Sequence, residues 1–172
     1  MTADELTKHV TDEAARELND ALGKIVHCLD QLDEAQIWSR PQALMNSIGN
    51  LLLHLDGNLT QWIVCGVGGA PDRRNRPAEF AERGPIAKCE LVRRLEVAVA
   101  AAKASLEGTS GAELASVRRI QGFEVTGLGA VFHSVPHFRG HTQEIVHMTR
   151  RTLGDGYRIQ WQPATGEQGA AL

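Results

Sequence analysis

The stretch from residue 43 to residue 65, ALMNSIGNLLLHLDGNLTQWIVC, decides the fold of this chain. Apolar residues recur in it at intervals of three or four, a spacing that places them along one face of an α-helix. Gly66, Gly68 and Gly69 follow, as is typical of a helix end. The stretch therefore predicts a long amphipathic helix that faces a core. Its apolar stripe consists of Leu44, Ile48, Leu51, Leu52, Leu55, Leu59 and Trp62.

Three further segments have the same helical period. The first covers residues 2–32, with Thr2 and Glu5 spaced as in a capping box at its start. The other two are expected at residues 85–108 and 127–153. Four amphipathic helices with little strand signal predict an all-α fold, a four-helix bundle.

The connections between these helices are longer than an ideal bundle needs. Residues 68–85 hold several glycines and prolines and four arginines, and are predicted to form a loop. Residues 108–126 are irregular, with a short extended piece around 117–125. Long loops in compact domains tend to be functional or disordered. We expect the bundle to occupy residues 1–156 and residues 157–172 to form a C-terminal extension or loose tail.

Length and charge limit the classes of protein to consider. The 172 residues suit one domain with its own core. A formal net charge of −3 gives no polybasic surface for nucleic acid or an anionic membrane. The first ten residues lack the bases of a signal peptide, and no stretch approaches the roughly 18 apolar residues of a membrane span. We expect a cytoplasmic protein that binds neither nucleic acid nor a membrane. Cys28, Cys65 and Cys89 form no CxxC pair and are expected to be buried free thiols.

Histidines at regular spacing are the main functional signal. His133, His137 and His141 stand four residues apart in the 127–153 helix, and His137 and His141 lie on one flank of it. That spacing suits two ligands of a single metal ion. In the 43–65 helix, His54 lies about 120° from the apolar stripe. The two helices together could supply three ligands.

The flank that carries His54 is polar. Asn50 and Asn58 lie on it, and such groups are costly to bury without partners. A polar cavity between the two helices would supply those partners. We expect Asn50, Asn58 and His133 to line this cavity around the three candidate ligands. A plainer interpretation stays open, in which the histidines are only hydrogen-bonded or half-exposed.

Two stretches resemble the DinB-like superfamily of bacterial metal-binding bundles. Residues 47–63, SIGNLLLHLDGNLTQWI, are similar to its second helix, and residues 133–145, HSVPHFRGHTQEI, are similar to its last helix. Residues 157–163, YRIQWQP, resemble an uncharacterised subfamily. The resemblance implies a four-helix bundle, often a homodimer, that binds one divalent transition metal ion, often zinc or nickel. The ligands that it implies are His54, His137 and His141.

The chain departs from the family pattern at three positions. Glu144 stands where glutamine is usual, and Gly140 stands where a large residue often precedes the second histidine. Pro136 removes one backbone donor within the last helix and is expected to bend it before His137. These differences leave the substrate open.

Characterised members of the superfamily include transferases and isomerases that use bacillithiol, mycothiol or glutathione. The resemblance therefore implies a metal-dependent transferase that joins a small thiol to an electrophile. A metal-dependent hydrolase and a non-enzymatic metal-binding or dimerisation module stay open as alternatives. Glu144 could orient a ligand, act as a base, become a fourth ligand or be an exposed carboxylate. Arg73, Arg74, Arg76 and Arg83 could hold the carboxylates of the thiol or could simply be solvated.

Overall fold

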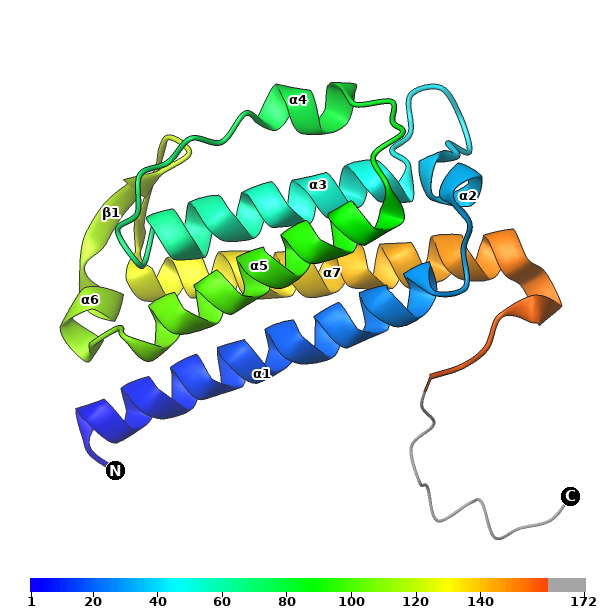
Figure 1. Cartoon of the computed structure of the whole chain (residues 1–172). Coiled ribbons are helices and arrows are strands. Elements are labelled where there is room, and N and C mark those ends of the chain that lie inside the picture. Colours follow the sequence, from blue (N-terminus) through cyan, green and yellow to red (C-terminus); the bar gives the residue numbers. More distant parts are fainter. Residues whose placement is uncertain (161–172) are drawn as a thin grey trace, which may run out of the picture.

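Four long helices form the framework of the fold: α1 (Ala3–Leu29), α3 (Ile48–Leu59), α5 (Lys88–Glu107) and α7 (Gly127–Leu153). Figure 1 shows them in the computed structural model, which describes residues 1–160. The predicted all-α helical bundle is confirmed. Among the described residues, none of the helices has the length and apolar character to cross a membrane.

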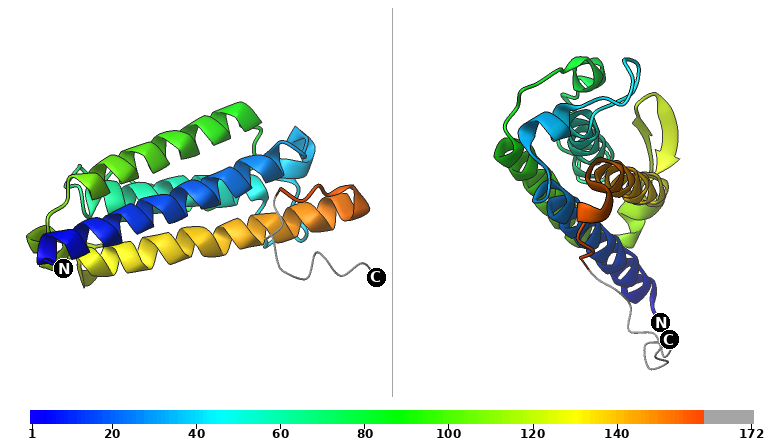
Figure 2. Two further views of the ribbon diagram at one scale, coloured as in Figure 1. Left: turned by 90° about the horizontal axis from the view of Figure 1, so that it is seen from below. Right: turned by 90° about the vertical axis from the view of Figure 1, so that its right-hand side faces the viewer.

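The four long helices surround one core. α1 packs against α5 and α7, and α3 packs against the same two helices. α1 and α7 run in one direction, and α3 and α5 run in the opposite one (Figures 1 and 2). α3 and α5 are consecutive among the long helices and run in the same direction. The chain between them must therefore return along the bundle. This return segment, residues 66–87, passes outside α3 (Figure 1).

The core is built from the apolar stripes of the four helices. Each helix contributes side chains with at most 1% of their surface exposed, such as Leu18, Leu55, Leu95 and Phe138. α7 continues through Pro136 as one helix. Burial of these stripes removes apolar surface from water, which is the main force that holds such a bundle together.

Shorter elements connect the long helices. A hairpin precedes α7, where an extended piece was predicted, and Gln121 and Gly122 at its turn both have positive φ, as a type I′ turn requires. Cys65 is the last residue of the π-helix that continues α3, and its thiol donates to the carbonyl of Pro71 at 3.5 Å. The shorter elements are α2 (Glu34–Trp38), the π-helix η1 (Thr60–Cys65), α4 (Arg76–Ala81), α6 (Gly111–Ala115), β1 (Val117–Ile120), β2 (Phe123–Thr126) and the 3-10 helix η2 (Gly154–Gly156).

The helix predicted to begin at residue 43 begins at Ile48. The hydroxyl of Ser47 accepts a hydrogen bond from the Asn50 N–H (3.2 Å), and the Asn50 side chain accepts one from the Ser47 N–H (3.2 Å). This capping box starts the helix later than the apolar period indicates. Leu44, expected in the apolar stripe, is therefore fully exposed, and that assignment was wrong.

Removing the Ser47 hydroxyl tests this helix start. We expect Ser47→Ala to lower the free energy of unfolding by about 1 kcal/mol, because the Asn50 N–H loses its acceptor. The exposed Ser39→Ala should change it by less than about 0.5 kcal/mol. Urea unfolding followed by circular dichroism measures both, and equal stability of wild type and Ser47→Ala would contradict the capping role.

Other boundaries also differ from the prediction, and the first helix ends at Leu29 rather than at residue 32. The third long helix begins at Lys88 rather than Pro85. Residues 68–85 are not loop throughout, because they contain α4, whose first turn is capped by the Asn75 side chain accepting from the Ala78 N–H (3.3 Å). Such a short helix has too few residues to show a period.

The cysteines are free, as expected, but not all are buried. Cys28 is buried and Cys65 is half-buried. Cys89 is exposed, so the expectation of buried thiols was wrong for this residue.

The segment after α7 is attached to α1 at its start. The Arg158 N–H donates to Oε1 of Gln31 (2.7 Å), and a ring nitrogen of His27 lies 2.6 Å from the Arg158 carbonyl. The guanidinium of Arg150 lies 4.9 Å from the centre of the Tyr157 ring. Residues 161–172 of the predicted tail lie outside the described residues.

Candidate metal centre

Three imidazole rings from two helices meet between α3 and α7. His54 comes from α3, and His137 and His141 come from α7. One nitrogen atom from each lies within 4.8 Å of the other two. The ring centres are 5.0 Å apart for His54 and His137, 5.3 Å for His54 and His141, and 4.6 Å for His137 and His141. The fold therefore brings together the three histidines that the sequence singled out.

The spacing of the nitrogens suits ligands of one ion. Nε2 of His54 and Nε2 of His137 are 3.2 Å apart. Two nitrogens bound at 2.0–2.1 Å to one tetrahedral ion lie about 3.3 Å from each other. Imidazole donors favour zinc, copper, iron or nickel over magnesium or calcium. The residues present thus fit a divalent transition metal.

The cluster lies at the edge of the core and is open on one side. His54 is buried, with 7% of its side chain exposed, whereas 26% of the His141 side chain is exposed. A site with three protein ligands and solvent access leaves a coordination position for a small molecule. Closed structural zinc sites normally have four protein ligands.

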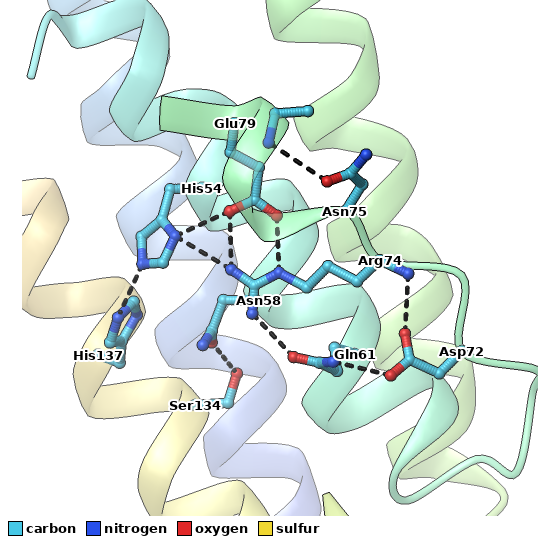
Figure 3. Close-up of polar contacts among 10 residues, drawn as sticks. His54, Asn58, Gln61, Asp72, Arg74, Asn75, Glu79, Ser134 and His137 are labelled. Atoms are coloured by element: carbon cyan, nitrogen blue, oxygen red, sulfur yellow. Dashed lines mark hydrogen bonds and ion pairs between the residues drawn. The ribbon is translucent and has the colours of Figure 1, made fainter. Parts of the chain in front are cut away.

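An ion pair from the return segment lies behind His54 (Figure 3). Oε2 of Glu79 is 3.0 Å from Nδ1 of His54. Arg74 donates from Nε and Nη2 to the two Glu79 oxygens, at 2.6 and 2.8 Å. Burial raises the pKa of the Glu79 carboxyl, but hydrogen bonds from Arg74 and His54 outweigh burial and hold the pKa below its ordinary value. Glu79 is therefore a carboxylate at neutral pH.

Further hydrogen bonds fix this ion pair in place. Nη1 of Arg74 donates to Gln61 (2.9 Å), which in turn donates to Asp72 (2.7 Å). The side chain of Asn50 donates to the backbone carbonyls of Glu79 (2.8 Å) and Glu82 (3.0 Å). Asn50, expected to line the cavity, thus binds the backbone of the return segment instead.

The other two expected cavity residues lie beside the cluster. The Ser134 hydroxyl donates to Oδ1 of Asn58 at 3.1 Å, which links α3 to α7 near the three histidines (Figure 3). The ring of His133 stacks on Trp62, with ring centres 3.8 Å apart. His133 is 5.8 Å from the His137 ring centre and is not one of the three converging histidines.

Glu144 lies behind His141. Its Oε2 is 2.7 Å from Nδ1 of His141, and 44% of its side chain is exposed. With Nδ1 engaged by Glu144, Nε2 is the nitrogen of His141 that is left to bind a metal. Among the roles left open for Glu144, this geometry favours orientation of the imidazole.

His137 differs from the other two histidines. Its Nδ1 is buried and has no hydrogen-bond partner within residues 1–160. Burial, together with the neighbouring His141 and His54, lowers the pKa of His137 to about 4. The imidazole is therefore neutral at pH 7, which is the form that binds metal.

The metal-free protein should lose stability as the pH falls from about 6.5 to about 4. In the unfolded chain His137 protonates near pH 6.5, whereas in the folded chain it protonates near pH 4. The unfolded state thus binds one more proton within this window and none above it, so acidification favours unfolding. Urea midpoints measured with a chelator should fall more steeply through this window for wild type than for His137→Gln. Parallel curves would contradict the low pKa.

The four arginines of the return segment have different surroundings. The side chain of Arg74 is buried, so the solvated interpretation is wrong for it, while Arg73, Arg76 and Arg83 are exposed. The guanidinium of Arg76 lies 4.9 Å from the centre of the Phe80 ring, which is itself 4.9 Å from the His54 ring. Arg76 therefore lies at the rim of the cluster.

Comparisons with known proteins identify a fold and a family but no activity. No curated protein matches the chain. A solved structure described as "Crystal structure of the conserved protein of locus from Enterococcus faecalis" is similar, with a TM-score of 0.70 and 19% identity over 84% of this chain and 97% of that one. At this identity the likeness concerns the fold alone. Residues 5–163 match the family described as "Protein of unknown function (DUF1572)", and because that match spans most of the sequence, the chain belongs to this family.

Proposed function

We propose that this chain is a DinB-like protein that binds one divalent transition metal ion, zinc or nickel, through His54, His137 and His141. The observation that carries the proposal is the convergence of three imidazole nitrogens within 4.8 Å. Carboxylates behind His54 and His141 add support, because metal-bound histidines commonly donate their other N–H to such groups.

We further propose that the protein is a transferase that joins a low-molecular-weight thiol to an electrophile. A bound metal would lower the pKa of the thiol from about 8.5 and supply a thiolate at neutral pH. The exposed side of His141 gives the thiol access to the cluster. Arg76, over Phe80, would bind a carboxylate of the thiol, as guanidinium groups do well.

We also propose that the protein works as a homodimer, because members of the superfamily that it resembles are often dimers. Light scattering of the purified chain measures its mass directly. A mass of one chain, 18.7 kDa, at micromolar concentration would contradict a stable dimer.

A thiol-dependence assay tests the transferase. Metal-loaded protein is incubated with glutathione, mycothiol or bacillithiol and a panel of epoxides and haloalkanes, and the thioether products are measured by mass spectrometry. The proposal expects product that requires thiol and disappears in His54→Ala. Turnover of esters without thiol would indicate the hydrolase instead. If neither reaction occurs while metal stays bound, a non-enzymatic metal-binding module is left.

A further inference from the structure

We infer that Glu79, held by Arg74, is the residue that positions His54 for metal binding. The site would then depend on the return segment as well as on the two helices that carry the ligands. This inference rests on the proposed metal-binding function and names a positioning residue for it.

The position of the proton on His54 decides which of its ring nitrogens can bind a metal. A neutral imidazole carries one proton, on Nδ1 or on Nε2, and a metal can bind only the nitrogen that lacks it. A carboxylate only accepts hydrogen bonds, so Glu79 at 3.0 Å from Nδ1 favours the tautomer with the proton on Nδ1. That leaves the lone pair on Nε2, the nitrogen that faces His137 at 3.2 Å.

Arg74 also approaches Nδ1 of His54, with Nη2 at 3.0 Å. This contact could be a hydrogen bond only in the opposite tautomer, because a guanidinium donates and does not accept. Nη2 already donates to Oε2 of Glu79 at 2.8 Å. The negative charge on Glu79 makes the carboxylate the stronger partner of the imidazole N–H. Arg74 therefore acts on His54 through Glu79.

The Glu79 carboxylate is itself held in a fixed position. Both of its oxygens are paired with Arg74, and Asn50 holds its backbone carbonyl. Only 10% of the Glu79 side chain and 4% of the Arg74 side chain are exposed. A carboxylate fixed in this way restricts the rotation of the imidazole that it binds. By contrast, Glu144 behind His141 lies on an exposed surface of α7.

A notch in the surface of α3, left by the missing side chain of Gly57, accommodates the ion pair of Arg74 and Glu79. Gly57 is one turn beyond His54, and a Cβ atom on it would lie 2.1 Å from Oε1 of Glu79 and 2.9 Å from Nε of Arg74. A glycine in a helix interior is normally unfavourable compared with alanine. Its presence here provides the space in which the carboxylate reaches Nδ1 of His54.

Replacing Glu79 by glutamine tests the role at nearly constant shape. We expect Glu79→Gln to weaken zinc binding about 10–100-fold, because the neutral amide no longer favours the proton on Nδ1. Zinc affinity is measured at pH 7 by competition with a chromophoric chelator. The exposed Glu96→Gln on α5 makes the same change of charge and should bind zinc like wild type.

The tautomer gives a second readout that needs no metal. The ¹⁵N shifts of the His54 ring in metal-free protein should report a proton on Nδ1 in wild type and a shift towards Nε2 in Glu79→Gln. A general loosening of the fold would not move the proton in this direction.

Gly57→Ala approaches the same carboxylate from the other side. It leaves every charged group in place but displaces Glu79 from the notch, and should also weaken zinc binding. Its control is Gly23→Ala in α1, where an added Cβ would meet one side-chain atom within residues 1–160, at 4.0 Å. This variant keeps the inference testable if Glu79→Gln folds poorly.

The outcomes separate the two proposals. Failure of the wild type to bind zinc or nickel would refute the proposed metal site. Tight zinc binding by wild type, Glu79→Gln and Gly57→Ala alike, with an unchanged His54 tautomer, would refute only the positioning role of Glu79.

Discussion

His137→Ala is expected to carry less than about a tenth of the metal that wild type binds, with wild type near one ion per chain. Removing one of the three proposed ligands leaves two imidazoles, His54 and His141, because the converging group within residues 1–160 has no fourth member. The central ring is also the one whose pKa of about 4 keeps it neutral and ready to bind at pH 7. Elemental mass spectrometry of the purified proteins measures the ratio.

His147→Ala is the matched control for this experiment. It removes an exposed histidine from the same helix, outside the cluster, and should leave the metal content unchanged. Equal metal in His137→Ala and His147→Ala would contradict the proposed ligand set. If wild type takes up no divalent ion at neutral pH, the three histidines only line a polar cavity, and the enzymatic proposals fail with the site.

The cluster of three histidines could be predicted from the sequence because each part of it follows a helical period. His137 and His141 are one turn apart, so their common flank follows from helix geometry alone. His54 stands at a fixed angle from a long apolar stripe that must face the core. Two helices of one bundle, each with a polar flank, are then expected to turn those flanks to each other.

The role of Glu79 could not be predicted from the sequence in the same way. It lies 25 residues from His54 in the chain, on a six-residue helix within a stretch rich in arginine, glycine and proline. An acidic residue in such a stretch is expected to be solvated. The neighbouring sequence does not indicate that the segment returns along α3. That path follows from the parallel course of α3 and α5, which only the whole fold determines.

One sequence signal did point to a close approach. Gly57 interrupts a strongly apolar helix without ending it, and an interior glycine often marks a place where another group comes near. The later start of α3 had a comparable signal in the Ser47 to Asn50 spacing of its capping box. In both cases a local side-chain contact, rather than the apolar period, set the structure.

The ion pair between Arg74 and Glu79 leads to a large effect on stability. We expect Arg74→Met to lower the free energy of unfolding by about 3–5 kcal/mol, because it leaves Glu79 buried without its charged partner. The exposed neighbour Arg73→Met removes the same group and should cost less than about 0.5 kcal/mol. Urea unfolding of metal-free protein at pH 7 measures both variants.

The double variant Arg74→Met with Glu79→Leu separates stability from ligand positioning. Removing both charges relieves the unpaired carboxylate, so most of the lost stability should return. Zinc affinity should stay weak, because no carboxylate then fixes the proton on Nδ1 of His54. If Arg74→Met proves as stable as Arg73→Met, the ion pair does not hold the return segment against α3, and the hydrogen bond from Asn50 to the Glu79 backbone carbonyl must hold it instead.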